Sequence, residues 1–298
     1  MSSEPKTISA KSIVFKNKSP DQWFGLDYNM NIYHGCPHGC IYCDSRSDCY
    51  GITDFDTVRV KENALEIIRN NLRRKVKKGV VGTGAMSDPY NPLEKTQELT
   101  RHALELINAF GFGAGLTTKS DLIARDVDIL QDIKTHSPVI ALFSITTAND
   151  DLCKKIEPAV ASTSKRFAAM KTLAQKGIFC GVLLVPLLPY ITDTKDNIID
   201  LCNMAKANGA KFVYTYMGMT LRSGNRQYYY KNLDNVSPDI KFKYINTFGN
   251  RYHCPSPHAK ELFDIFANEC ERLGLLYDMK AIIYNYKHGY RREQLTLF

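Results

Sequence analysis

Three closely spaced cysteines are the residues of this chain with the most specific chemistry. They lie in the segment 33–43, which reads Tyr-His-Gly-Cys-Pro-His-Gly-Cys-Ile-Tyr-Cys and gives the spacing C-x3-C-x2-C. A [4Fe–4S] cluster is usually held by four cysteine thiolates. Three thiolates from one loop, those of Cys36, Cys40 and Cys43, would leave one iron open to a substrate or cofactor, as in catalytic metal sites. The spacing therefore favours an iron–sulfur cluster with an open iron.

Two other interpretations of this loop remain open on its sequence. A zinc ion could be held by the three thiolates with His34 or His38 as the fourth ligand, or the thiols could be unligated in a buried loop. Gly35 and Gly39 allow the loop to fold back so that the sulfurs converge. Tyr42 places an aromatic ring between the last two cysteines.

The composition indicates a globular protein of the cytoplasm rather than a secreted or membrane protein. The 298 residues are 44% hydrophobic and 23% charged, and they can form one large α/β domain or two smaller ones. Segment 1–16 has no apolar signal region, and the longest apolar run, 178–190, is too short to span a bilayer. Nine cysteines then indicate a reducing compartment. The net charge of +8 favours a polyanionic partner, either nucleic acid or an acidic electron donor such as a flavodoxin.

Strand-like and helix-like segments alternate along the chain. The strand-like segments are 26–32, 79–83, 113–118, 139–146, 178–186 and 212–216. Helix-like segments with apolar residues at three- to four-residue spacing are 65–76, 91–110, 122–133, 167–173 and 198–205. Strands that are joined through helices form a parallel sheet with right-handed crossovers. The pattern predicts an α/β fold, either an incomplete (β/α)6 barrel or a doubly wound sheet.

The cysteine loop directly follows the first strand, at the edge where barrels place their active sites. The segments after the next strands also carry polar groups, in Gly84–Tyr90, Thr117–Ser120 and Phe143–Thr146. A cation among them could bind the carboxylate of a zwitterion such as methionine. We expect an N-terminal arm over 1–25, a barrel over 26–220, and an extension over 221–298 that shields a reactive intermediate from water. In that extension we expect helices around 239–248 and 257–273.

The whole chain resembles the radical S-adenosylmethionine (SAM) superfamily, and within it the spore photoproduct lyase branch. The matching stretches are 35–43, 84–90, 118–120 and 143–145. The resemblance implies an incomplete (β/α)6 barrel with a C-terminal helical and loop extension. It also implies that a [4Fe–4S] cluster binds SAM at its open iron. One electron, from a flavodoxin or ferredoxin, then cleaves SAM to a 5′-deoxyadenosyl radical.

The resemblance also assigns cofactor contacts to three residues of this chain. Ser87, Lys119 and Ser144 occupy the positions that contact SAM in the lyase, with Lys119 on the SAM carboxylate. Tyr42, between the last two cluster cysteines, is the fourth expected contact. The implied ligands of the cluster are the three cysteines of the loop.

Two departures from the lyase concern its return of a hydrogen atom to the product. The lyase uses a cysteine two residues before its Ser-Asp pair, where this chain has Ala85, and a tyrosine directly after the third cluster cysteine, where this chain has Asp44. Repair of the lyase's lesion by that relay is therefore not expected. Tyr42, Tyr90 and Cys49 are the candidates for a substitute donor.

The last five residues, Gln-Leu-Thr-Leu-Phe, resemble the peptide by which bacterial replication and repair proteins bind the sliding clamp. Leu297 and Phe298 would enter an apolar cleft while Gln294 forms hydrogen bonds, with Leu295 beside them. An apolar tail that folds back on its own domain is the alternative.

The sequence thus leaves two classes of function in view. The first is a radical SAM enzyme that acts on a damaged or modified base in DNA or RNA, with a peptide or a small metabolite as the alternative substrate. The second is a zinc-stabilised, non-catalytic adaptor that its C-terminal peptide recruits to a partner.

Overall fold

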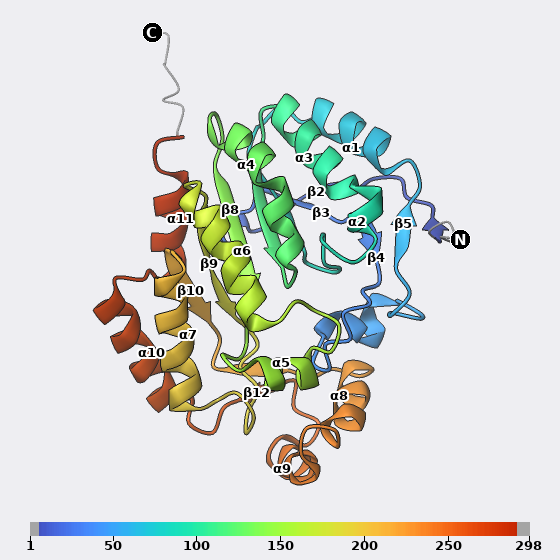
Figure 1. Cartoon of the computed structure of the whole chain (residues 1–298). Coiled ribbons are helices and arrows are strands. Elements are labelled where there is room, and N and C mark those ends of the chain that lie inside the picture. The colour runs from blue at the N-terminus through green and yellow to red at the C-terminus, as the bar shows by residue number, and fades with distance from the viewer. Residues whose placement is uncertain (1–5, 291–298) are drawn as a thin grey trace.

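The computed structural model describes residues 6–290, and its central element is a sheet of seven strands (Figure 1). The strands lie in the order β10-β9-β8-β7-β6-β3-β2. Their bounds are β2 Val14–Lys16, β3 Tyr28–Met30, β6 Val80–Thr83, β7 Gly113–Thr118, β8 Val139–Ser144, β9 Phe179–Leu184 and β10 Phe212–Thr215. Neighbours from β3 to β10 are parallel, whereas β2 pairs antiparallel with β3 at the edge.

The strand order decides between the two expected architectures. From β3 to β10 the order in space is the order in sequence, so every crossover moves in the same direction around the sheet. A doubly wound sheet would reverse its direction at a switch point. The fold is therefore the incomplete (β/α)6 barrel, and each of its parallel strands lies within a segment that the sequence predicted.

Helices between the strands cover the outer face of the sheet (Figure 1). They are α1 Ala64–Arg73, α2 Glu94–Gln97, α3 Leu99–Ala109, α4 Val127–Lys134, α5 Asp150–Ile156, α6 Thr163–Gln175 and α7 Lys195–Ala207. Side-chain caps begin the later ones, since the hydroxyls of Ser162 and Thr194 accept hydrogen bonds from the first turns of α6 and α7. Gly177 and Gly209, in left-handed conformations, follow their last turns as expected.

The first expected helix is shorter in the structure. It ends at Arg73, and Val76 is 97% exposed rather than buried. The residues from Arg73 to Lys78 are mostly basic, and like charges repel one another along a helix. The buried face of α1 therefore ends at Leu72.

The second expected helix is split into α2 and α3 at Glu98, whose φ is +49°. The break lets the buried carboxylate of Glu94 accept a hydrogen bond from the Thr100 backbone N–H at 2.8 Å. The break also shifts the inward face of α3. Ala103, Leu104 and Ile107 are buried, whereas Leu106 and Phe110, which continue the three- to four-residue spacing of segment 91–110, are only half-buried.

The part of the chain after β10 adds a small sheet and four helices to the barrel. The strands are β11 Gly218–Thr220 and β12 His253–Pro255, and the helices are α8 Asn225–Leu233, α9 Pro238–Phe248, α10 Ala259–Leu273 and α11 Met279–Lys287. Helices α9 and α10 lie where they were expected, while α8 and α11 were not predicted. Helix α10 packs on α7. Helix α11 packs its Ile282 and Tyr286 into one cluster with Phe24 and strand residues, and the Tyr286 hydroxyl donates to the Phe24 carbonyl at 2.6 Å.

A second small sheet frames the cysteine loop. It contains β1 Thr7–Ile8, β4 Tyr33–His34 and β5 Arg59–Lys61 in the order β1-β5-β4. The loop therefore follows β4 rather than the first barrel strand directly. Short 3-10 helices, η1 Pro20–Gln22, η2 Asp44–Arg46, η3 Asp48–Tyr50 and η4 Asp121–Asp126, complete the described elements.

Two expectations about partners remain, one for the C-terminal peptide and one for membranes. Gln294–Phe298 lies outside the described residues, so clamp binding stays a prediction. Between residues 6 and 290, no helix is both long and apolar enough to cross a membrane.

Candidate active site

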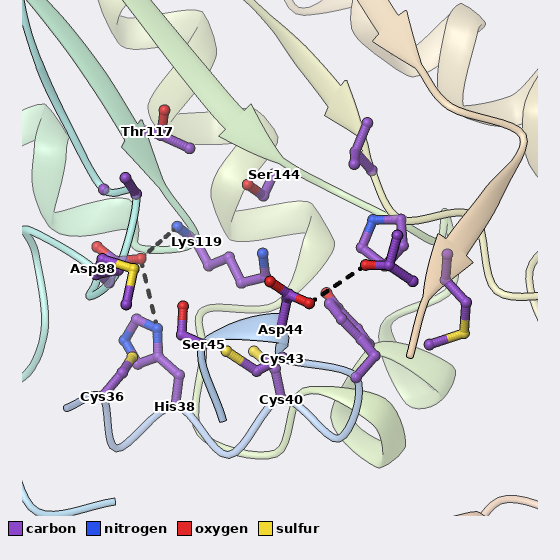
Figure 2. A pocket seen from close by; sticks show the side chains of 18 of the residues that line it. Cys36, His38, Cys40, Cys43, Asp44, Ser45, Asp88, Thr117, Lys119 and Ser144 are labelled. Carbon is purple, nitrogen blue, oxygen red and sulfur yellow. Dashed lines mark hydrogen bonds and ion pairs between the residues drawn. The ribbon is translucent and has the colours of Figure 1, made fainter. Parts of the chain in front are cut away.

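The three cysteines line one cavity of about 550 Å³ at the carboxyl ends of the barrel strands (Figure 2). Cys40 is buried, and Cys36 and Cys43 are half-buried. Among residues 6–290, no three His, Cys, Asp or Glu side chains converge to hold a single metal ion. A cluster does not require such convergence, because each thiolate binds a different iron. The donor set and the room above it therefore fit a cluster better than a mononuclear zinc site.

The loop between β6 and α2 holds the cysteine loop from one side. The buried Ser87 hydroxyl donates to the Gly35 carbonyl at 2.5 Å. Gly35 itself has a φ of +84°, and a Cβ there would lie 2.5 Å from the Thr57 carbonyl oxygen. Only glycine fits this turn without displacing the backbone. Ser87 thus lines the cavity, and its hydroxyl hydrogen bond also fixes the cysteine loop.

Asp88 links the cysteine loop to the end of β7. Its carboxylate accepts hydrogen bonds from the Thr118 hydroxyl and the Lys119 backbone N–H, both at 2.7 Å, and it lies 3.5 Å from Nδ1 of His38. Burial lowers the pKa of His38 despite the nearby Asp88 carboxylate, so we expect a neutral imidazole at pH 7. Sequence reasoning missed this positioning role of Asp88, although the residue stood in the matching Ser-Asp pair.

Lys119 extends across the cavity between Ser144 and the cysteine loop (Figure 2). Its Nζ lies 5.7 Å from the centre of the Tyr42 ring. It has no carboxylate partner within ion-pair distance among residues 6–290. A cation without a partner in a cavity is suited to an anionic ligand group. The structure thus brings together Tyr42, Ser87, Lys119 and Ser144, the four residues for which cofactor contacts were predicted.

Burial dominates the protonation of the three thiols. It raises the pKa of Cys36 to about 12 and raises the pKa values of Cys40 and Cys43, while the charge of Lys119 acts in the opposite direction on the last two. Without metal the thiols are therefore protonated at neutral pH. Cluster assembly must displace these protons, as is usual for thiolate sites.

A buried ion pair supports the cysteine loop from the other side. The Tyr42 hydroxyl donates to Glu157, which pairs with the fully buried Arg166. Arg166 also donates to the Ser144 carbonyl at 2.6 Å and to the Ala161 carbonyl at 2.7 Å. Both the Tyr42 ring and the end of β8 are thereby fixed. No sequence motif marks Glu157 or Arg166, and their pairing requires the fold.

Replacing Arg166 by methionine should lower the free energy of unfolding by about 3–5 kcal/mol, because the Glu157 carboxylate would remain buried without its partner. Urea unfolding of anaerobically prepared protein measures the change. Lys165→Met, at an exposed neighbouring position of α6, is the matched control and should be nearly neutral. Equal unfolding midpoints for the two variants would show that the pair is not important for stability.

The structure places the candidate hydrogen donors, and the two positions that differ from the lyase, at different distances from the cavity. Tyr90 is buried and does not line the cavity, and the exposed Cys49 lies outside it, with its Sγ 3.6 Å from Arg222. Ala85 and Asp44 both line the cavity. Among the three candidate hydrogen donors, Tyr42 is therefore the one at the cavity wall.

Comparison with known protein families shows to which family this chain belongs. The model of the Radical SAM superfamily matches residues 30–202. The chain belongs to the radical SAM superfamily. This membership makes it a radical SAM enzyme rather than a zinc-stabilised adaptor.

Several relatives match more than half of the chain. An uncharacterized protein of Methanocaldococcus jannaschii is 35% identical over 191 residues, which are 63% of this chain and 69% of the relative. An uncharacterized protein of Mycobacterium tuberculosis is 28% identical over 242 residues, 79% of this chain and 71% of the relative. A radical SAM Nα-GlyT isomerase of Pseudomonas phage M6 is 22% identical over 85% of this chain and 52% of its own length.

Among solved structures, spore photoproduct lyase complexed with a dinucleoside spore photoproduct has a TM-score of 0.64 at 17% identity. The match covers 84% of this chain and 75% of the lyase. The methyltransferase TsrM of Kitasatospora setae has a TM-score of 0.55 at 10% identity, covering 88% of this chain and 56% of TsrM. At these identities the likeness shows the fold.

The cofactors follow from the family and fit the residues of this cavity. A lyase variant of the same fold has been solved with bound AdoMet, and the radical SAM superfamily uses a [4Fe–4S] cluster and SAM. Here Cys36, Cys40 and Cys43 would hold the cluster, and Lys119 would bind the SAM carboxylate. When bound, the pair supplies a 5′-deoxyadenosyl radical after transfer of one electron.

Proposed function

We propose that this radical SAM enzyme acts on a damaged or modified base in nucleic acid. The observation that carries the proposal is the composition of the cavity wall. Aromatic side chains of Trp23, Tyr214, Tyr216 and His253 line the same cavity as the cysteine thiols. Aromatic rings are the usual platforms for unstacked bases, and a radical formed at the thiol end would act on a base held at this wall.

Charge and similarity support the same substrate class. The chain carries a net charge of +8. Arg222 lies 3.4 Å from the carboxylate of Asp44, which lines the cavity, and its guanidinium is 4.7 Å from the ring centre of Tyr252. The lyase of the same fold binds a dinucleoside photoproduct, and a curated relative is named for Nα-GlyT isomerisation. Cationic and aromatic groups together suit phosphate and base.

The residues around the cavity would have separate roles in this reaction. The cysteine loop positions the radical source, Ser87 and Asp88 fix that loop, and Lys119 orients SAM. The cavity removes substrate from water, which protects a radical from stray hydrogen donors. Electrons would come from a flavodoxin- or ferredoxin-type donor.

Formation of 5′-deoxyadenosine tests the proposal. Anaerobically reconstituted protein with SAM and reductant should form it at least about tenfold faster when ultraviolet-damaged or base-modified DNA or RNA is added. Loss of the altered base in digests identifies the substrate. Stimulation by peptide or metabolite pools, with none by nucleic acid, would assign the alternative substrate class.

The methyl group of Ala85 cannot return a hydrogen atom, so spore photoproduct should be converted to thymine slowly and with by-products. Ala85→Cys places a thiol on the cavity wall and should raise the thymine yield severalfold, as measured by chromatography of digested DNA. Ala85→Ser is the size-matched control, because its stronger O–H bond is a poor hydrogen donor. Efficient and clean repair by the unaltered protein would show that another residue replaces the lyase cysteine.

A further inference from the structure

The cavity continues into a second lobe of about 430 Å³ on the side of the N-terminal arm. We call it the arm lobe and define it by Asn17, Lys18, Ser19, Trp23, Asn29 and Thr117. Trp23, Ala85 and Thr117 line the arm lobe and also the lobe that contains the cysteines. A ligand in the arm lobe would thus lie directly beside the radical source. Segment 1–25 was expected to form a separate N-terminal arm, and its residues Asn17, Lys18, Ser19 and Trp23 contribute to the wall of the arm lobe.

Small residues of β6 and its following loop line the arm lobe. Gly82 pairs with Asn29 across the sheet, and Ala85 follows two residues after the end of β6. Gly84 has a φ of +90°, and a Cβ there would lie 2.2 Å from the Thr117 carbonyl oxygen. Leu26 fills the space over Gly82, where a Cβ would lie 2.6 Å from its side chain, so the lobe has a closed floor. Its volume is within the usual range for ligand pockets.

Two polar side chains of the arm lobe form no hydrogen bond with the described part of the chain, residues 6–290. Asn29 and Thr117 are half-buried on neighbouring parts of the inner face. Among residues 6–290, neither the Asn29 carboxamide nor the Thr117 hydroxyl lies within hydrogen-bond distance of a partner. The Asn17 amide, in contrast, donates to the Leu26 carbonyl at 2.7 Å. Both groups line the lobe, so both can hydrogen-bond to a polar ligand that enters it.

Trp23 and Lys18 add an aromatic ring and a positive charge to the arm lobe. Trp23 is 43% exposed, and its ring meets those of Phe24 and Tyr214 edge-on, with centroids 5.1 and 6.0 Å away. These contacts hold one large aromatic ring at the boundary of the two lobes. Lys18 is exposed on the arm side, where its charge can meet a phosphate.

We propose that the arm lobe binds the substrate base itself, turned out of its strand. The Asn29 carboxamide would pair with an edge that offers one N–H and one C=O, as thymine and uracil do. Trp23 would pack on the base, and Lys18 would contact the adjoining phosphate. This inference rests on the proposed function and adds the place where the base binds and a residue that contacts its edge.

Trp23 is the sole tryptophan of the chain, so its fluorescence reports on this lobe without requiring turnover. Titrating the dinucleotide dTpdT into anaerobically reconstituted protein with SAM should give a saturable change in emission. Asn29→Ala should weaken the apparent affinity about tenfold. Asn235→Ala, at an exposed asparagine, is the control and should leave it unchanged.

Asn29→Asp provides an isosteric second variant. A carboxylate only accepts hydrogen bonds, so it should reject the thymine carbonyl and favour the amino group of cytosine. The preference for dTpdT over dCpdC should therefore fall at least tenfold or reverse. If nucleic acid stimulates 5′-deoxyadenosine formation while Trp23 emission and both Asn29 variants show no effect, the arm lobe is not the base site, although the proposed function stands. If Trp23 responds to peptides and not to dinucleotides, both are wrong.

Discussion

Replacing any one of Cys36, Cys40 and Cys43 by alanine should abolish the bound cluster and with it all reductive cleavage of SAM. Each thiolate is expected to hold a separate iron, so the loss of one leaves two ligands for four irons. The other six cysteines, at positions 49, 153, 180, 202, 254 and 270, do not line the cavity. The effect on activity should therefore be complete rather than graded.

Iron and sulfide analysis of anaerobically reconstituted protein, with electron paramagnetic resonance of the reduced sample, measures this outcome. Cys49→Ala is the matched control, because Cys49 is exposed and lies outside the cavity. It should keep the full cluster and full SAM cleavage. A triple alanine variant that retained iron and sulfide would place the cluster elsewhere in the chain.

The cysteine loop and the polar segments of this site could be predicted from the sequence because each lies within a short stretch of the chain. The cysteine loop contains its ligands within eight residues, and the polar residues after the strands meet because parallel strands end at one edge. Six strands alternating with helices left two architectures open, and the strand order then distinguished them. Local spacing thus indicated the cysteine loop and the repeated unit indicated an α/β fold, whereas the resemblance to the radical SAM superfamily implied the barrel and the residues expected to contact SAM.

The features that were missed depend on contacts between distant segments. Glu157 and Arg166 are charged residues on amphipathic segments, and only burial reveals that they pair beneath Tyr42. The role of Asp88 needs His38 and the end of β7 to lie nearby. Helix α11 was not predicted, since its apolar face becomes meaningful only against the segment around Phe24. In each case the decisive information is which surfaces meet.

Lys119→Ala should weaken SAM binding by about 1.5–3 kcal/mol, the usual cost of losing a hydrogen bond to a charged group, which is roughly one to two decades in affinity. The reason is geometric, because Lys119 is a cation inside the cavity with no carboxylate within ion-pair distance between residues 6 and 290. The backbone N–H of Lys119 donates a hydrogen bond to the Asp88 carboxylate at 2.7 Å. This bond does not involve the side chain, so the alanine variant should keep its fold and the position of its cysteine loop.

A SAM analogue shows whether the lost contact is the one to the carboxylate. Decarboxylated SAM lacks that group, so the unaltered protein should bind it roughly one to two decades more weakly than SAM, whereas Lys119→Ala should bind the two about equally. Equilibrium dialysis under anaerobic conditions gives all four affinities and hence the coupling between side chain and carboxylate. Lys77→Ala, at an exposed lysine remote from the cavity, should preserve the full preference. If Lys119→Ala also retained it, another residue would bind the SAM carboxylate, and Lys119 would instead serve to offset the charge of the cluster.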